Sequence, residues 1–90
     1  MVFEWNEEKA GANARKHGVT FHEAATVFGD PFAITFADPD HSIQEQRYLT
    51  FGVSRFDRRL VVSHADHGER VRIVSARLMT RSEKRICEEG

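Results

Sequence analysis

The 90-residue sequence predicts one α+β domain, in which two N-terminal helices pack on one face of a four-stranded, mainly antiparallel sheet and a further helix follows at the C-terminus. Two observations support this fold class. Helix start signals occur at Asn6 and Thr20, before any strand. From Phe32 onward apolar residues alternate with a period of two, over four segments that short polar turns separate. A chain of this length buries one small core.

The first helix is predicted over residues 7–17. Asn6 is a good N-cap, because its side chain accepts hydrogen bonds from the backbone N–H groups of the first turn. Gly18 supplies the left-handed position at which helices commonly end. Residues 3–5, directly before the cap, are interpreted as either a short strand or an anchoring arm.

Capping boxes predict the other two helices, because each has a threonine three residues before a glutamate. Thr20 and Glu23 begin a short helix that ends by residues 29–31. Thr80 and Glu83 begin the C-terminal helix. Both helices therefore have a defined first turn.

The four strands are predicted at residues 32–36, 47–53, 59–65 and 70–78. A turn centred on residues 67–68 would place Ser63 opposite Arg72 and Val62 opposite Ile73, since antiparallel partners keep a constant index sum. On this register the helix-covered face carries Ile34, Phe36, Leu49, Phe51, Val53, Leu60, Val62, Val71 and Ile73. The open face carries Tyr48, Thr50, Arg59, Val61, Ser63, Arg72 and Val74. Because this open face combines hydroxyls with guanidiniums, we expect a functional site there.

Composition indicates an ordinary cytoplasmic protein. No run approaches the roughly 18 apolar residues that a membrane span requires, and no signal peptide is visible. A lone cysteine, Cys87, excludes an internal disulfide. We therefore expect no membrane contact and a reducing environment.

Charge is unevenly distributed along the chain. Residues 1–45 carry three basic and eight acidic side chains, whereas residues 46–90 carry ten basic and six acidic side chains. Ten of the thirteen basic residues are arginine, whose planar fork binds phosphate or carboxylate in a bidentate manner. The C-terminal half is therefore a candidate phosphate-binding surface, and a solvated charged rim is the alternative.

Short motifs along nearly the whole chain resemble the BrnT toxin family. They are Phe3 to Asn6, Lys9 to Asn13, Arg15 to Gly18, Phe21, Ala24, Ala25, Asp38 to Asp40, Arg47, Leu60 to Val62, Ile73 to Arg77, and Glu83. The resemblance implies a type II toxin with a RelE-like fold. It also implies a ribonuclease that inhibits translation, neutralised by a BrnA-like antitoxin with a ribbon-helix-helix DNA-binding domain. DNA would then be contacted only through the antitoxin, within a toxin-antitoxin hetero-oligomer.

Metal-free RNA cleavage requires a group that stabilises the pentavalent phosphorane, and arginine suits that role. Arg72 is the first candidate, because a strand holds its side chain firmly. Its alternative role is to pair with a surface acid such as Glu69. Arg77 lies five residues further on and faces the opposite way on an ideal strand, so it joins the site only if the strand end twists or bulges.

Three residues are candidates for the acid and base. His64 titrates in the useful range, but the register places it on the covered face, where a packed histidine is the alternative. Glu83 already has a structural explanation as the capping-box acid. Tyr48 offers a phenol, although an exposed strand tyrosine is common.

Further polar residues are candidates for RNA contact, namely Lys9, Lys16, Arg47, Arg59, Ser63 and Arg81. Lys9 and Lys16 share a stripe on the first helix with Asn13, which in the alternative interpretation bonds locally to a neighbouring loop. No recognised metal-ligand spacing is present, and no cofactor is expected.

Two other classes of function remain open. One is a non-enzymatic module that binds RNA or an acidic protein segment through the arginine-bearing face. The other is a small metal-dependent nuclease. RNA cleavage that persists in a chelator would distinguish a metal-independent ribonuclease from both of these classes.

Overall fold

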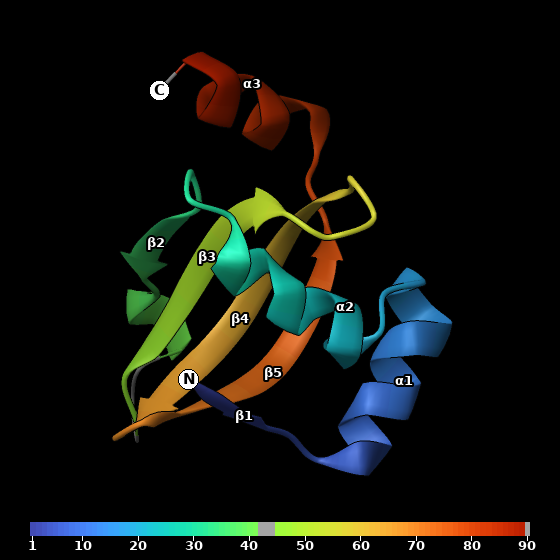
Figure 1. Ribbon diagram of the computed structural model, residues 1–90, viewed down its shortest axis with the longest axis vertical. Coiled ribbons are helices and arrows are strands. Elements are labelled where there is room, and N and C mark those ends of the chain that lie inside the picture. Colours follow the sequence, from blue (N-terminus) through green and yellow to red (C-terminus); the bar gives the residue numbers. More distant parts are fainter. Residues whose placement is uncertain (42–44, 90) are drawn as a thin grey trace.

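The structure is a computed structural model that describes residues 1–41 and 45–89 (Figure 1). Its strands are β1 (Val2–Glu4), β2 (Ile34–Ala37), β3 (Arg47–Val53), β4 (Arg59–His67) and β5 (Arg70–Leu78). Its α-helices are α1 (Glu7–His17), α2 (Phe21–Thr26) and α3 (Arg81–Glu89), with 3-10 turns η1 (Val27–Gly29) and η2 (Pro39–His41). The predicted α+β class is confirmed.

The described strands form one sheet in the order β1-β5-β4-β3-β2. All neighbours are antiparallel except β1, which pairs with β5 in parallel through Val2 opposite Arg70 and Glu4 opposite Arg72. The strand alternative for residues 3–5 is therefore confirmed in place of the arm, with bounds one residue earlier, and the described sheet has five strands where four were predicted. This pairing brings the N-terminus beside the start of β5, the last strand of the sheet along the chain.

The two N-terminal helices cover one face of the sheet. In Figure 1, α2 crosses in front of the sheet and α1 lies beside β5, while α3 stands beyond the end at which β5 finishes. The core between helices and sheet consists of Val19, Phe21, Ala24, Val27, Leu60, Val62, Ile73 and Ala76. Within residues 1–41 and 45–89, no such layer of helices covers the opposite face of the sheet.

The helix termini follow the predicted capping signals. Asn6 Oδ1 accepts from the backbone N–H groups of Glu8 and Lys9, at 2.9 and 3.1 Å. Gly18 ends α1 with φ of 68°, in the left-handed region that favours glycine. Thr20 Oγ1 likewise accepts from the Glu23 N–H at 3.0 Å. The predicted starts of α1 and α2 are confirmed, but Glu23 does not close the second capping box, because its carboxylate accepts hydrogen bonds from Ser54 and Arg58.

Asn13 joins α1 to the sheet from a buried position. Its Nδ2 donates to the carbonyls of Val19 and Ala76, at 2.9 and 2.8 Å, and its Oδ1 accepts from the Ala76 N–H at 3.0 Å. The bond to Val19 is the local bond of the alternative interpretation of Asn13. The two bonds to Ala76 add a connection between segments that lie 63 residues apart.

The predicted register of the β4–β5 hairpin is wrong. Arg72 lies opposite Ala65 rather than Ser63, and Ile73 lies opposite His64 rather than Val62. The reason is the turn, which lies at residues 68–69 with Gly68 at φ of 67°, so that His67 pairs with Arg70. A two-residue loop with a left-handed glycine shifts the pairing relative to a turn centred on residues 67–68.

The same hairpin contains a β-bulge. The register shifts between Ser63 and His64, because Ser63 pairs with Ser75 while His64 pairs with Ile73. One extra residue on β5, Val74, therefore has no opposite partner. Beyond this point every side chain of β5 changes face relative to an ideal strand.

The predicted phase of β3 is also wrong. Tyr48 and Thr50 share the helix-covered face with their partners His64 and Val62, whereas the neighbouring Leu49, Phe51 and Val53, with Ile34 and Phe36 of β2, line the open face. Gly52 shows why the strand lies this way round. A Cβ atom at Gly52 would stand 2.8 Å from Val27 Cγ1, so only a glycine allows β3 to approach η1 this closely. The face of β3 that carries Gly52 is therefore the one that the helices cover.

None of the helices in the described part of the chain is long and apolar enough to cross a membrane.

Candidate functional site

The open face of the sheet carries the predicted arginines. Arg72 lies opposite Ala65 and Arg77 opposite Val61, and these two β4 residues are four positions apart and share a face. Arg77 was predicted to share the face of Arg72 only if the strand end twists or bulges. The bulge at Val74 meets this condition, so the two arginines share one face although they are five residues apart. By strand rise the two Cα atoms are separated by roughly 15 Å.

Polar side chains gather at the two ends of this face. The hairpin-end cluster consists of Glu4, Glu45, Arg47, His67, Arg70 and Arg72. The helix-end cluster consists of Arg59, Arg77, Glu83 and Glu88. Between them, Ser63 and Ser75 form a cross-strand pair of hydroxyl side chains. The face is thus a row of charges and hydroxyls along β4 and β5.

Glu45 lies at the centre of the hairpin-end cluster. Its Oε1 accepts from Arg72 Nη2 and lies 3.5 Å from Arg47 Nε, while its Oε2 lies 3.0 Å from His67 Nε2. The hydrogen bond with His67, followed by the charge of Arg72, lowers the pKa of the Glu45 carboxyl. Arg72 therefore does pair with an acid, but that acid is Glu45 rather than the expected Glu69.

His67 lies between two carboxylates. Its Nδ1 lies 3.2 Å from Glu4 Oε1, opposite the contact of its Nε2 with Glu45. The hydrogen bonds to Glu45 and Glu4 raise the pKa of the His67 imidazole. His67 was not among the predicted site residues. Gly68 was the available signal. A two-residue loop at residues 68–69 pairs His67 with Arg70 and so places His67 on the same face as the arginines.

The helix-end cluster is built on a bidentate ion pair. Arg77 Nη1 and Nη2 donate to Glu83 Oε1 and Oε2, at 2.7 and 3.0 Å. The bonds with Arg77 hold the pKa of the Glu83 carboxyl at about 2, although partial burial opposes the shift. Glu83 is thus ionised at neutral pH and, while paired, has no proton to donate.

The capping box at the start of α3 has formed as predicted. Glu83 Oε1 accepts from the Thr80 N–H at 2.8 Å, and Thr80 Oγ1 accepts from the Glu83 N–H at 3.2 Å. Nearby, Arg59 Nη2 lies 3.3 Å from Glu88 Oε1. Arg81, another predicted RNA contact, is exposed at the start of α3.

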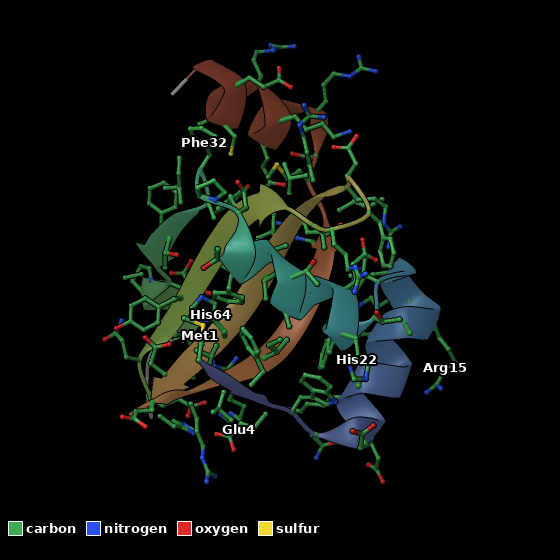
Figure 2. All side chains as sticks on the ribbon, in the orientation of Figure 1. Met1, Glu4, Arg15, His22, Phe32 and His64 are labelled. Atoms are coloured by element: carbon green, nitrogen blue, oxygen red, sulfur yellow. The ribbon has the colours of Figure 1, made fainter. Side chains whose placement is uncertain are left out.

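His64 and Tyr48 lie on the helix-covered side, away from the arginines. The ring of His64, which is only 3% exposed, stacks on Tyr48 and makes a T-shaped contact with Phe28. Its Nε2 is 2.7 Å from Thr50 Oγ1, and burial lowers the pKa of its imidazole. His64 and Met1 line the same pocket, and Figure 2 shows both near the start of the chain. The expected place of His64 on the covered face is confirmed, whereas the expected place of Tyr48 on the open face is wrong.

The predicted contacts on α1 lie beside the sheet rather than on its open face. Lys9 and Lys16 line a shallow hollow of about 220 Å³, together with Val74 and Ser75 of β5. Ser75 also belongs to the open face, so the two lysines flank the edge of the candidate site. Arg47 and Ser63 lie on the open face itself.

An apolar groove adjoins the same face. Its volume is about 490 Å³, and its lining is formed by Ile34, Phe36, Leu49, Phe51, Glu83, Ile86 and Cys87. Ile86 is 68% exposed and Phe36 is 53% exposed, so the groove is open to solvent. In the described part of the chain, no group of three or more His, Cys, Asp or Glu side chains is arranged to hold a metal ion.

Comparison with known proteins identifies the family. Residues 5–83 match the family model described as the ribonuclease toxin, BrnT, of type II toxin-antitoxin systems. The fold is similar to the crystal structure of the Brucella abortus ribonuclease toxin BrnT, with a TM-score of 0.65 and 19% sequence identity over 90% of this chain and all of that chain. No curated protein sequence matches the chain.

The family match spans most of the chain, from Trp5 to the capping glutamate Glu83, and it contains the arginines of the open face. Such toxins have RNA as substrate and a cognate antitoxin as partner. The chain therefore belongs to the BrnT family of ribonuclease toxins of type II toxin-antitoxin systems.

Proposed function

We propose that the open face of the sheet is the ribonuclease site and that it cleaves RNA without a metal ion. One observation carries the proposal: the bulge in β5 brings Arg72 and Arg77 to the same face. Guanidiniums on a strand present donors in a fixed fork that matches phosphate oxygens. RNA bound along this face would meet one guanidinium at each end.

In a metal-free reaction the 2′-hydroxyl attacks the phosphorus of the adjacent 3′-phosphodiester, and the bond from that phosphorus to the 5′-oxygen of the next nucleotide breaks. Charge accumulates on the non-bridging oxygens in the transition state, and donors fixed in advance stabilise it most. We assign this role to Arg72, which a central strand holds in place. Arg77, Arg47 and Arg59, with Ser63 and the flanking Lys9, Lys16 and Arg81, are proposed to hold the RNA backbone.

The placement of the other candidates argues against a chemical role for three of them. His64 and Tyr48 lie behind the sheet, and Glu83 is an ionised partner of Arg77. We therefore propose that Glu83 positions Arg77. We keep His64 and Tyr48 only as packing residues under the helices.

We further propose that the antitoxin is a BrnA-like protein with a ribbon-helix-helix domain, that the two chains form a hetero-oligomer, and that DNA is contacted through the antitoxin alone. Family membership supports this partner. A cytoplasmic location follows from the proposed action, because the RNA whose cleavage inhibits translation is there.

The test is cleavage of a defined RNA by the purified protein in excess EDTA. We expect cleavage to persist in EDTA and to end in a 2′,3′-cyclic phosphate, and we expect Arg72→Ala to lose it. Cleavage that stops in EDTA and returns with a divalent cation would show a metal-dependent nuclease. RNA that is bound through the arginines yet stays intact would show a binding module instead.

A further inference from the structure

The carboxylate of Glu45 lies among the cationic side chains of the hairpin-end cluster. Glu45 meets three side chains that carry or can carry positive charge, namely Arg72, Arg47 and His67, and each comes from a different strand. Its two oxygens divide these contacts, with the arginines at Oε1 and the imidazole at Oε2. The three side chains therefore converge on a single carboxylate.

The geometry around this anion also fits a phosphodiester. The two non-bridging oxygens of a phosphodiester are spaced much like the two oxygens of a carboxylate, and guanidinium forks bind both groups. Arg72 offers a further donor, since its buried Nε has no hydrogen-bond partner among the residues that the structure describes. Exchanging Glu45 for a phosphodiester replaces one negative charge by another, so the cations remain neutralised.

We propose that Glu45 stands in the position of the scissile phosphate when RNA is absent, and that His67 is the acid that protonates the leaving 5′-oxygen. This inference rests on the proposed function of the open face. It makes Glu45 an internal competitor of the substrate. It also makes His67 a catalytic residue, because His67 and Arg72 both contact the Glu45 carboxylate whose place the phosphate takes.

In the proposed step, the 2′-oxygen forms a bond to phosphorus as its proton passes to water. The bond from phosphorus to the 5′-oxygen breaks, and His67 Nε2 gives its proton to that oxygen. The products are a 2′,3′-cyclic phosphate, a free 5′-hydroxyl and a neutral imidazole, which takes a proton back from solvent. No oxidant or metal enters the balance.

Glu4 is the positioning residue for this acid. It holds His67 at Nδ1, so the imidazole keeps one carboxylate partner after Glu45 has left Nε2. The charged groups facing His67 are Glu4 of β1, Glu45 before β3, and Arg72 of β5, with Arg70 on the far side of Glu4. The carboxylates favour the protonated imidazole, and Arg72 opposes it.

The first experiment measures binding of a 2′-O-methyl RNA oligonucleotide, which cannot be cleaved, to Glu45→Gln. We expect this variant to bind severalfold more tightly than the parent protein, because it lacks the competing anion. Glu69→Gln is the matched control, since it removes the same charge from the exposed hairpin turn. The assay is run at a mildly acidic pH, at which His67 is protonated in each protein.

Equal affinities for Glu45→Gln and Glu69→Gln would overturn the inference. If Arg77→Ala then still abolished binding, the RNA site would lie at the helix end and the proposed function would survive. If the unaltered protein neither bound nor cut RNA, the proposed function itself would fail. The two failures are therefore distinguishable.

The second experiment tests His67 through the pH dependence of kcat. We expect His67→Gln to lower kcat by about 100-fold or more and to remove the decline at high pH that a general acid produces. Glu4→Gln should move that decline to lower pH, because it takes away a carboxylate that stabilises the imidazolium. A His67→Gln protein with an unchanged thermal midpoint and the parent pH profile would exclude His67 as the acid.

Discussion

Arg77 and Glu83 are joined by two parallel hydrogen bonds, which tie the last residues of β5 to the first turn of α3. The same carboxylate accepts from the Thr80 N–H, so one side chain both caps the helix and holds the arginine. The pair thereby sets the direction in which Arg77 leaves the sheet.

Glu83→Gln should reduce the dependence of stability on pH. The pKa of Glu83 is about 2 in the folded protein against 4.5 in an unperturbed carboxyl. Its stabilisation is therefore complete above pH 4.5 and is lost as the pH falls towards 2. We expect the difference in Tm between parent and variant to be largest above pH 4.5 and to shrink below it, as followed by circular dichroism. A constant difference would contradict the assigned pairing.

Arg72→Ala should abolish toxicity while leaving the fold intact. Arg72 is partly exposed at the open face, and surface substitutions change stability little, so Tm should stay within a few degrees of the parent value. Growth of cells that express the variant is the readout, with Arg15→Ala on the exposed surface of α1 as the control. Full toxicity in a folded Arg72→Ala protein would remove Arg72 from the site.

Asn13→Ala should destabilise the protein strongly without touching the open face. The change leaves three buried backbone groups at Val19 and Ala76 without their partner, and each unsatisfied group costs about 1–3 kcal/mol. We expect a loss of about 3 kcal/mol in the free energy of unfolding, measured by urea denaturation. Lys16→Ala, on the same helix but exposed, should change it by less than about 0.5 kcal/mol.

Glu23→Gln should weaken the connection between α2 and the β3–β4 loop. The buried Glu23 carboxylate accepts from Ser54 Oγ at 2.7 Å and from Arg58 Nε at 2.9 Å, and the bond with Arg58 is the main cause of its lowered pKa. Breaking a buried pair costs about 3–5 kcal/mol, and we expect the lower limit because Arg58 is partly exposed. A loss no larger than that of Glu69→Gln in the same denaturation assay would contradict this role.

The capping residues show what could be predicted locally. Asn6 and Gly18 bound α1 as expected, because a cap needs only the few residues around it. Thr20 and Glu23 show the limit. Thr20 caps α2, but Glu23 bonds to Arg58 instead of closing the box, and its partner lies 35 positions further along the chain.

The strand phase shows why part of the site was missed. The segment from Tyr48 to Val53 alternates, but either alternate set could have been the covered one. Hydrophobicity alone favours Leu49 and Phe51 as the covered set, which is wrong. The Thr50 hydroxyl instead lies on the helix-covered face, within hydrogen-bond distance of Thr35 Oγ1 and His64 Nε2. Gly52 was the available signal, since a glycine inside a strand marks a close approach.

Local sequence signals predict the helix starts, the four strand segments after residue 31 and the arginines of β5, since each depends on residues close by in the chain. The register of the last hairpin, the bulge that turns Arg77 towards the face of Arg72, and the contact of Glu45 with His67 depend instead on contacts between distant segments. A shift of one residue in pairing reverses every side chain of a strand, and contacts across the whole sheet select which pairing has the lowest free energy.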